Sequence, residues 1–404
     1  MEGDSEHIMI ERHAYCGKVV MIIQYSSNNS GSTNSAQLSA EAVKQLGALP
    51  VICYAFEGPF SRENKYRTLV VSHKPWLRSE RLGRFVKNVL YEIPSYTQFQ
   101  KIFKDEKPDL VYINTMVSLP AAAAAKALQI PVLWHIRELF DDAGGEMKIP
   151  LGLGKRFVTK IINYLATNLI VVSEAVLKNV FANQSTPNVS LIPNAIDARY
   201  FMPSYTKADG LQQLGCSDLN NRPVIGVPGT LRPMKGHKFL LSAVPLVLLT
   251  FPNAFFLISG SGQQSYIAEL QALVANLEIS DFVKFTGSID DMIPFYDASD
   301  IVCIPSEAEP FGRTVIEAFA RKKAIVASNV GGIAETIQSG HNGCLVKYGD
   351  TAALARQIVH LLNHGDVRFE LGENAHADAR CKFHDEQYIK AIQEVIVKSF
   401  RPDN

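Results

Sequence analysis

Residues 301–327 read IVCIPSEAEPFGRTVIEAFARKKAIVA, and this stretch decides the fold. It opens with an apolar run over Ile301–Ile304, which has the length of a buried strand. Polar and turn-forming residues follow, and a helical pattern then covers 314–320. A second apolar run, Ala324–Ala327, predicts another strand. Strand, helix and strand in this order predict a βαβ unit whose strands lie parallel in one sheet.

The same alternation runs along the chain in two sets. The first set predicts strands over 19–24, 51–56, 109–114, 131–135, 169–172 and 189–192, and helices over 36–46 and 120–128. The second predicts strands over 224–227, 254–259, 283–286, 301–304 and 324–327, and helices over 238–250, 265–276 and 314–320. Prolines, asparagines and aspartates cluster between the sets, over 193–223. We therefore expect an α/β protein with two doubly wound, Rossmann-like domains facing across a cleft, where ligands would bind beyond the strands' carboxyl ends.

Composition excludes several classes of protein. Lysine plus arginine and aspartate plus glutamate both number 40, and a formal net charge of zero argues against nucleic acid as a partner. The six cysteines include no C-x-x-C pair, which argues against a zinc site or a disulfide framework and favours a reducing cytosol. The acidic N-terminus has no secretory-signal pattern. Pro245, Pro252 and Asn253 interrupt the apolar stretch 239–258, which predicts a buried helix, a turn and a strand rather than a membrane span.

Basic residues gather between His73 and Lys107, a window with eight lysines and arginines and four acidic residues. Apolar side chains recur there at helical spacing, at Leu82, Phe85, Val86, Val89 and Leu90. Such a helix either lies on an anionic membrane surface or is an ordinary surface helix with a solvated basic face. A second basic stretch, 148–160, fits both interpretations. A cytoplasmic location, either free or peripheral at the inner membrane face, is expected.

The segment Glu309–Glu317, EPFGRTVIE, carries the strongest chemical signal. It follows a strand, Gly312 permits a tight turn, and a helix start offers backbone N–H groups and a partial positive charge to a phosphate. One glutamate would hold hydroxyls of a sugar and the other those of a ribose. For Glu317 an alternative stays open, because Thr314-x-x-Glu317 is also a capping box that merely satisfies the helix start.

Other βα loops add candidate residues. Arg232 and Lys235 follow the strand over 224–227, and two cations there would stabilise a leaving diphosphate. Gly260-Ser-Gly262 follows the next strand and predicts either a phosphate contact or a plain turn. In the first domain, Gly31 lies in a polar loop just ahead of a helix, without a G-x-G-x-x-G dinucleotide fingerprint. His135 ends a predicted strand. Its side chain either faces the cleft or has a purely structural role.

On these segments the chain resembles the family 4 glycosyltransferases, which have the fold called GT-B. The most specific part is Ser306-x-x-Glu309-Pro-Phe-Gly312-x-x-x-x-Glu317, which resembles the family's E-x7-E motif. Further segments fall in family order: Trp134–Glu138, Val172–Ser173, Ile192–Asp197, Lys235–Gly236, Gly260–Gly262, Ala298–Asp300, Gly331–Glu335 and Asn342–Gly343. The resemblance covers nearly the whole chain. It implies a retaining transfer of a sugar from a UDP- or GDP-sugar to a glycan or lipid-linked acceptor, in polysaccharide or glycolipid synthesis.

The resemblance also implies roles for individual residues. Glu309 resembles the glutamate that holds donor-sugar hydroxyls, Glu317 the one that binds ribose, and Lys235 the diphosphate lysine. His135 resembles a histidine near the transferred sugar, and Gly31 a loop glycine near the leaving phosphate. The expected catalytic residues are Glu309, His135, Lys235 and Arg232. The expected donor-binding residues are Gly31, Gly229, Gly260, Gly262, Phe311, Gly312, Arg313, Thr314, Val315 and Glu317. No metal and no cofactor is expected.

The family pattern further implies an acceptor-binding domain over 1–195, a donor-binding domain over 196–384, and a C-terminal helix over 385–404 that crosses back to the first domain. Three positions depart from it. Thr230 stands where the family has a phosphate arginine, Gly31 lacks a paired glycine, and Ala195 follows Asn194 where a glycine is usual. These departures keep two alternatives open, a catalytically silent sugar-binding or scaffold protein and a nucleotide-sugar epimerase.

Overall fold

The computed structural model describes residues 15–28, 31–141, 145, 147–181, 186, 188–203 and 205–400. The chain forms two compact units. Unit 1 contains residues 1–194 and 385–404, and unit 2 contains residues 195–384. Each unit has its own parallel sheet, so the expectation of two α/β domains is confirmed.

Unit 1 is built on a seven-stranded sheet in the order β3-β2-β1-β4-β5-β6-β7. Its strands are β1 (Val19–Gln24), β2 (Leu49–Tyr54), β3 (Arg67–Val70), β4 (Leu110–Ile113), β5 (Val132–Ile136), β6 (Asn168–Val171) and β7 (Val189–Leu191). Its helices are α2 (Gly31–Gln45), α3 (Pro59–Arg62), α4 (Leu82–Tyr91), α5 (Ile93–Glu106), α6 (Leu119–Ala127), α7 (Gly154–Leu165), α8 (Glu174–Phe181) and α17 (Asp385–Phe400). The strand order reverses between β1 and β4, as in doubly wound folds.

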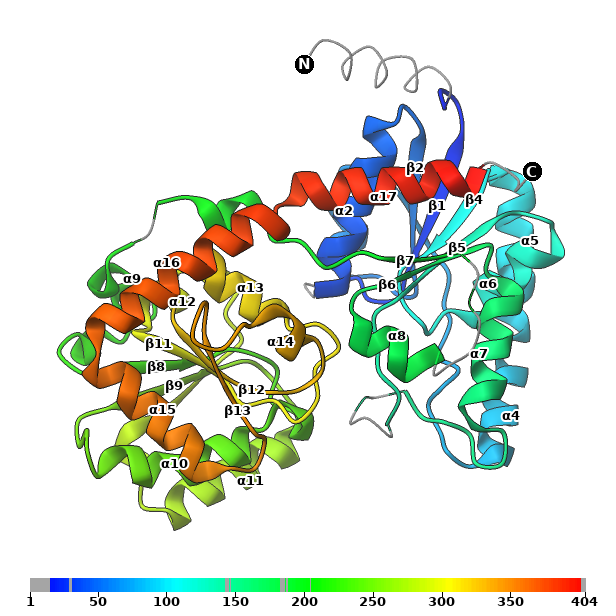
Figure 1. Ribbon diagram of the computed structural model, residues 1–404. Helices are drawn as coiled ribbons and strands as arrows, with labels where there is room; N and C mark the ends of the chain where they lie inside the picture. The colour runs from blue at the N-terminus through cyan, green and yellow to red at the C-terminus, as the bar shows by residue number, and fades with distance from the viewer. Residues whose placement is uncertain are drawn as a thin grey trace, which may run out of the picture. The chain divides into compact units, whose positions relative to one another are not determined.

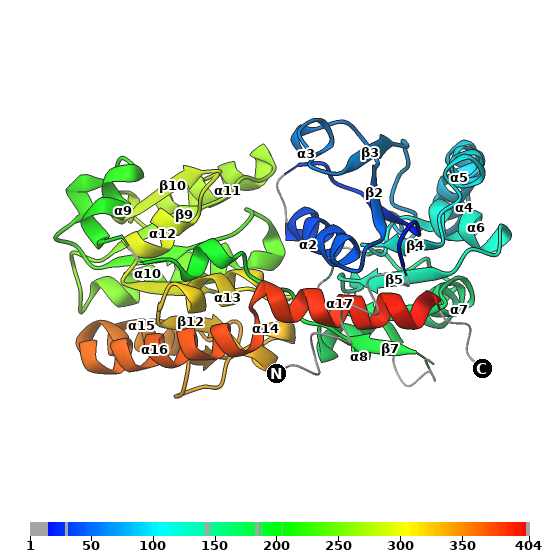
Figure 2. The ribbon, with the colours of Figure 1, turned by 90° about the horizontal axis from the view of Figure 1, so that it is seen from above.

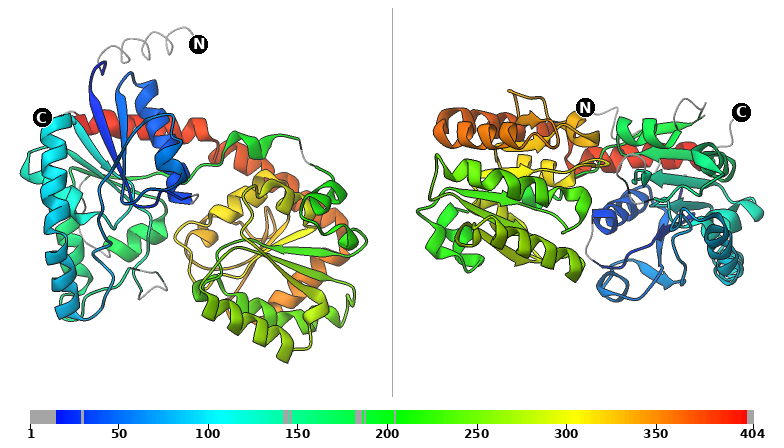
Figure 3. Two further views of the ribbon diagram at one scale, coloured as in Figure 1. Left: turned by 180° about the vertical axis from the view of Figure 1, so that it is seen from behind. Right: turned by 90° about the horizontal axis from the view of Figure 1, so that it is seen from below.

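Helices cover both faces of this sheet. Figure 1 and Figure 2 show α2 on one face and α5 and α6 on the other. The C-terminal helix α17 packs against α2 and β5, and Figure 3 shows it beside α2 from behind. Burial on both faces explains why the central strands are runs of apolar residues, such as VVMIIQ in β1 and LVYI in β4.

Unit 2 repeats the plan with six strands in the order β10-β9-β8-β11-β12-β13. Its strands are β8 (Val224–Val227), β9 (Phe255–Ser259), β10 (Val283–Gly287), β11 (Ile301–Ile304), β12 (Ile325–Ser328) and β13 (Cys344–Val346). Its helices are α9 (Lys207–Gln213), α10 (His237–Leu248), α11 (Gln264–Asn276), α12 (Ile293–Ala298), α13 (Arg313–Ala320), α14 (Gly331–Thr336), α15 (Thr351–Asn363) and α16 (Gly365–Lys382). Short 3₁₀ turns cover Ala198–Phe201, Ser217–Leu219, Pro233–Lys235 and Ser280–Phe282.

The core of unit 2 lies between its sheet and the helices α10, α11 and α15, which Figure 1 shows on one face of the sheet, with α12 and α13 on the other. The stretch 239–258 falls into α10 and β9, so its expected division into helix, turn and strand is confirmed. Within the residues that the structure describes, no helix is both long enough and apolar enough to cross a bilayer.

The structure corrects the predicted bounds of some helices and strands. Helix α2 begins at Gly31, so Gly31 opens the helix instead of lying in a loop ahead of it. The predicted helix began at residue 36, so the observed helix starts five residues earlier. The reason is that the small residues Thr33, Ser35 and Ala36 are all buried in α2. The edge strands β3 and β13 were not expected, and both are only partly buried.

Candidate functional site

Two loops at the carboxyl edge of the unit 2 sheet bring the main predicted residues together. The loop after β8 and the loop after β11 are neighbours because β8 pairs with β11, and this pair is where the strand order reverses. Open α/β sheets bind ligands at such a position. The backbone N–H groups of Glu307 and Ala308 both donate to the carbonyl oxygen of Met234, so the two loops are also bonded to each other.

Lys235 and Glu309 meet where these two loops are bonded to each other, and we call this place the Lys235–Glu309 junction. The Lys235 Nζ lies 2.5 Å from Glu309 Oε2, and Glu309 is 8% exposed. A buried carboxylate needs a partner of opposite charge, and this lysine supplies one. Arg232 lies on the same loop with an exposed side chain. A cation and a carboxylate on adjacent loops can hold the phosphate and the hydroxyl groups of one ligand.

The start of helix α13 completes the junction. Gly312 is the N-cap, with φ at 95°, a left-handed conformation that favours glycine. A Cβ atom at Gly312 would lie 3.7 Å from Glu309 Cγ, so Glu309 lies beside the helix start. The Val315 N–H donates to the Gly312 carbonyl oxygen at 2.9 Å, which closes the first turn of α13, and the expected donor contact of Val315 stays a prediction.

Glu317 is held by two neighbours. Arg313 Nε donates to Oε1 and Tyr296 Oη donates to Oε2, both at 2.8 Å. Burial, and the negative charge of Glu317 beside it, raise the pKa of Tyr296, so its hydroxyl keeps its proton and donates. The capping-box alternative is wrong, because Gly312 caps α13 and no side chain bonds to the helix start there. Glu317 is therefore a carboxylate fixed in orientation, with lone pairs left for a ligand.

Other predicted residues of unit 2 have structural explanations. A Cβ at Gly260 would lie 1.9 Å from the Gly229 carbonyl oxygen, and one at Gly262 would lie 2.2 Å from that of Leu231. These glycines let two βα loops approach each other, and their expected contact with a phosphate stays a prediction. Gly229 itself has φ at 135°, and a Cβ atom there would have no other atom within 4 Å. The Phe311 ring packs edge-on against Phe383, with centroids 5.9 Å apart.

The sequence reasoning missed His237, the first residue of α10. It is 1% exposed, and burial together with the Lys235 charge lowers its pKa to about 4. Its ring also hydrogen-bonds to the Arg232 backbone. His237 is therefore neutral, and its hydrogen bond helps to hold the segment that carries Arg232 and Lys235. The sequence could have indicated His237, because it directly follows Lys235-Gly236, where a site residue was predicted.

In unit 1 the predicted His135 is completely buried at the end of β5. Its Nδ1 lies 2.7 Å from Tyr112 Oη and 3.1 Å from Arg137 Nη2. Burial and the neighbouring Arg137 charge hold the pKa of His135 well below its usual range, so the ring is neutral. Arg137 also donates to the side chain of Asn114 after β4. Arg137 and Asn114 were not predicted, although both follow strands at the carboxyl edge of the sheet.

Gly31 lies in the same region of unit 1. The next residue, Ser32, accepts hydrogen bonds from Asn114 Nδ2 at 2.8 Å and from Gln24 Nε2 at 3.1 Å. These contacts fix the start of α2 against the ends of β1 and β4, where the strand order of unit 1 reverses. Ala195, which stands where the family usually has a glycine, is not among the residues with positive φ, so its backbone does not need a glycine there.

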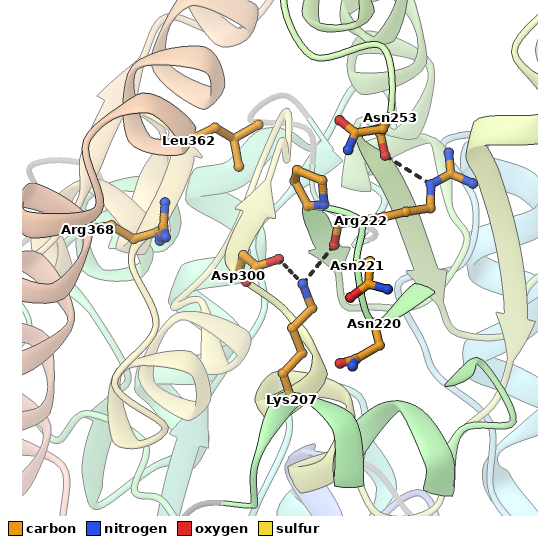
Figure 4. Close-up of a pocket in the computed structure, with 9 residues that line it drawn as sticks. Lys207, Asn220, Asn221, Arg222, Asn253, Asp300, Leu362 and Arg368 are labelled. Atoms are coloured by element: carbon orange, nitrogen blue, oxygen red, sulfur yellow. Dashed lines mark hydrogen bonds and ion pairs between the residues drawn. The ribbon is translucent and has the colours of Figure 1, made fainter. Parts of the chain in front are cut away.

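A cavity of about 310 Å³ lies elsewhere in unit 2. Its lining residues Pro223, Asn253 and Asp300 come just before β8, β9 and β11, so it opens at the amino edge of the sheet, opposite the Lys235–Glu309 junction. Figure 4 shows Lys207 there, bonded to Asp300 and to the Arg222 carbonyl group. No group of three or more histidine, cysteine or acidic side chains in the described part of the chain is arranged to hold a metal ion.

Comparisons with known proteins match both units. The family "Glycosyltransferase Family 4" matches residues 30–200, and "Glycosyl transferases group 1" matches residues 217–378. The lipopolysaccharide core biosynthesis mannosyltransferase LpcC of Rhizobium leguminosarum is 30% identical over 209 residues, 51% of this chain and 58% of the relative. The capsular polysaccharide biosynthesis glycosyltransferase CapM of Staphylococcus aureus is 27% identical over 72% of this chain and 77% of its own.

Among solved structures, Anabaena HepE in complex with UDP-glucose has a TM-score of 0.79 and 22% identity, over 94% of this chain and 99% of that one. This likeness shows that the chain has the GT-B fold. The matches to LpcC and two other curated relatives span 58%, 40% and 46% of those proteins, so the chain spans about half the length of these relatives.

Proposed function

Because the chain belongs to glycosyltransferase family 4, we propose that it transfers a hexose from a nucleotide-sugar donor to an acceptor with retention of the anomeric configuration. The observation that carries the proposal is the Lys235–Glu309 pair at the strand-order reversal of unit 2. The donor is a UDP- or GDP-sugar, and the acceptor is a glycan or a lipid-linked glycan. Relatives named for lipopolysaccharide and capsular polysaccharide synthesis support this choice of acceptor.

In this mechanism the nucleoside diphosphate departs while positive charge develops at the anomeric carbon. The negative charge of the leaving phosphates is stabilised by Lys235, Arg232 and the positive end of α13. In this mechanism no metal ion is required to neutralise that negative charge. Glu309 accepts hydrogen bonds from the sugar hydroxyls and orients the ring. Glu317, held by Tyr296 and Arg313, accepts hydrogen bonds from the ribose. The acceptor oxygen bonds to the anomeric carbon on the face from which the phosphate departs, and the leaving phosphate oxygen takes the acceptor proton. Attack on that same face gives retention.

The proposal is tested by incubating the full chain with UDP-, GDP- and ADP-sugars and short glycan or lipid-linked acceptors. We expect one donor to be consumed in the presence of EDTA, with a product whose new linkage has the donor's anomeric configuration by NMR. An inverted linkage would refute retention. Donor binding without turnover would instead support a silent sugar-binding protein, and interconversion of nucleotide-sugars would support a nucleotide-sugar epimerase.

We also propose that unit 1 contacts an anionic membrane surface, such as the cytoplasmic face of a bilayer. Apolar side chains on α4 stay in water, with Leu82 42%, Val86 47% and Leu90 59% exposed. Their i, i+4, i+8 spacing places them in one stripe. Two exposed cations, Arg84 and Lys87, lie on the same helix.

Helix α7 of unit 1 also has exposed apolar and basic side chains. It exposes Phe157 (38%) and Tyr164 (70%) together with Arg156 and Lys160. The segments before α4 and α7 are bonded to each other, since the Leu151 N–H donates to the Glu80 carbonyl oxygen at 2.7 Å. Apolar side chains beside cations match the boundary of an anionic bilayer, where acyl chains meet negative headgroups.

A further inference from the structure

The cavity at the amino edge of the unit 2 sheet lies away from the Lys235–Glu309 junction and is lined mostly by polar residues. Of its nine lining residues, three are cations, three are asparagines and one is an acid. Three positive charges and one negative charge give this lining a formal charge of +2. Only Pro223 and Leu362 are apolar, so the cavity has little apolar surface against which a nucleobase could pack.

The acid of this lining, Asp300, already has partners of its own. Its Oδ2 accepts hydrogen bonds from Lys207 Nζ at 2.5 Å and from the Val224 N–H at 2.7 Å. Lys207 also donates to the Arg222 carbonyl oxygen at 2.7 Å, and Figure 4 shows these bonds. Lys207 and Asp300 therefore neutralise each other and tie α9 to the start of β8. A cation entering the cavity would find no unpaired carboxylate among the nine lining residues.

The two arginines carry the remaining positive charge. Arg368 Nη1 donates to the Leu361 carbonyl oxygen at 2.6 Å, which leaves four of its five N–H groups for other acceptors. Arg222 donates to the Asn253 carbonyl oxygen at 2.9 Å and lies over the Phe255 ring. Within the described part of the chain, neither guanidinium group forms an ion pair with a carboxylate. A guanidinium group in this condition favours a carboxylate or a phosphate as its ligand.

The asparagines supply neutral hydrogen-bonding groups. Figure 4 shows Arg368 on one side of the cavity and Asn220, Asn221 and Asn253 on the other. These three amide side chains are exposed, and they form no hydrogen bonds with other residues that the structure describes. An amide group both donates and accepts, so it suits hydroxyl groups. We propose that this cavity binds a sugar phosphate, with the phosphate group paired to Arg368 and the hydroxyl groups bonded to the asparagines.

This site is separate from the proposed donor site. Pro223 and Asp300 lie just before β8 and β11, the two strands whose carboxyl ends lead to the Lys235–Glu309 junction. A ligand at the amino edge therefore leaves the junction open to a nucleotide-sugar. The inference does not depend on the proposed transfer of a sugar.

Isothermal titration calorimetry of the full chain tests the inference, with glucose 6-phosphate, inorganic phosphate and glucose as the probes. We expect one molecule of glucose 6-phosphate to bind per chain. Inorganic phosphate should bind at least about tenfold more weakly, because it lacks the hydroxyl groups that the asparagines would hold. Glucose should bind more weakly still, because it lacks the charged group. Arg368→Gln should weaken the binding of glucose 6-phosphate at least about tenfold, because the phosphate loses its guanidinium partner.

A second variant keeps the test independent of folding. Asn221→Asp places a negative charge on an exposed side chain that has no hydrogen bond to lose, so it should keep the fold and weaken binding about tenfold or more by repulsion. Gln271→Glu is the matched control, because it makes the same exchange of amide for carboxylate at an exposed position of α11 outside the cavity. It should bind glucose 6-phosphate as the wild type does.

Lys235→Ala distinguishes this site from the donor site. It should bind glucose 6-phosphate as the wild type does, since Lys235 lies at the opposite edge of the sheet. The inference would be overturned by any of four results: no binding of glucose 6-phosphate, equal binding of inorganic phosphate, unchanged binding in both Arg368→Gln and Asn221→Asp, or loss of binding in Lys235→Ala. None of these results depends on whether the protein transfers a sugar.

Discussion

At the scale of single residues, the donor proposal depends on Glu309. Its carboxylate is buried, bonded to Lys235 and adjacent to the start of α13. Glu309→Gln keeps the size of the side chain and removes its charge. We expect kcat to fall at least about 10²-fold while the melting temperature changes little, because the sugar hydroxyls lose a charged acceptor.

The matched control is Glu307→Gln, an exposed glutamate two residues earlier on the same loop. It should keep nearly full turnover. Equal losses in the two variants would indicate a general effect on the loop, and normal turnover in Glu309→Gln would contradict the role given to Glu309.

Lys235→Ala tests leaving-group stabilisation. We expect kcat to fall by about 10²–10³-fold, the loss typical of one removed oxyanion donor. Lys238→Ala removes a lysine three residues later that pairs with Glu269 on the surface, and it should have almost no effect. A higher KM with unchanged kcat in Lys235→Ala would show that the lysine contributes uniform binding only.

At the scale of helices and strands, sequence patterns predicted the central elements of both sheets. Buried strands such as β8 and β11 are continuous apolar runs, and their bounds agree with the expectation. The edge strands β3 and β13 have only a few residues and partial burial, so they lack that pattern. The start of α2 was missed because serine and threonine favour turns in isolation, whereas here they pack against the sheet.

The sequence predicted Lys235, Glu309, Glu317 and His135 from their places after strands. It could not predict their partners. Tyr296 bonds to Glu317 from another helix and Tyr112 bonds to His135 from the neighbouring strand, so only the folded structure brings them together.

His237, at the start of α10, should make the stability of the protein sensitive to acid. Its pKa is about 4 in the fold against 6.5 in the unfolded chain, so the unfolded chain alone takes up a proton as the pH falls between those values. The free energy of unfolding should therefore fall by about 3 kcal/mol from pH 6.5 to 4 on account of this group.

Urea unfolding of His237→Gln across that range checks the prediction. The variant should show a flatter pH dependence than the wild type, and His364→Gln, an exposed histidine in the same unit, should not. Parallel curves for the wild type and His237→Gln would contradict a buried neutral His237.

At the scale of the whole molecule, the exposed apolar and basic side chains of α4 and α7 predict binding to vesicles. We expect co-sedimentation with phosphatidylglycerol vesicles at low salt, with release at high salt, because screening weakens the attraction of cations to anionic lipid. Leu82→Ser combined with Leu90→Ser should weaken binding about tenfold or more, because two exposed leucines lose apolar contact with lipid.

Leu249→Ser is the matched control, since Leu249 is 82% exposed but belongs to unit 2. It should leave vesicle binding unchanged. Absence of binding at low salt, or equal binding to vesicles of neutral lipid, would contradict the membrane proposal and favour a solvated basic face.

The central claim is that the Lys235–Glu309 junction binds the diphosphate of a nucleotide-sugar, and isothermal titration calorimetry tests it most directly. The full chain would be titrated with UDP, GDP and ADP and their sugars, with EDTA present, alongside Lys235→Ala and Lys238→Ala. We predict binding of one nucleotide class by the wild type and by Lys238→Ala, weakened at least about tenfold in Lys235→Ala. Binding that Lys235→Ala leaves intact, or no binding of any nucleotide by the wild type, would contradict the claim.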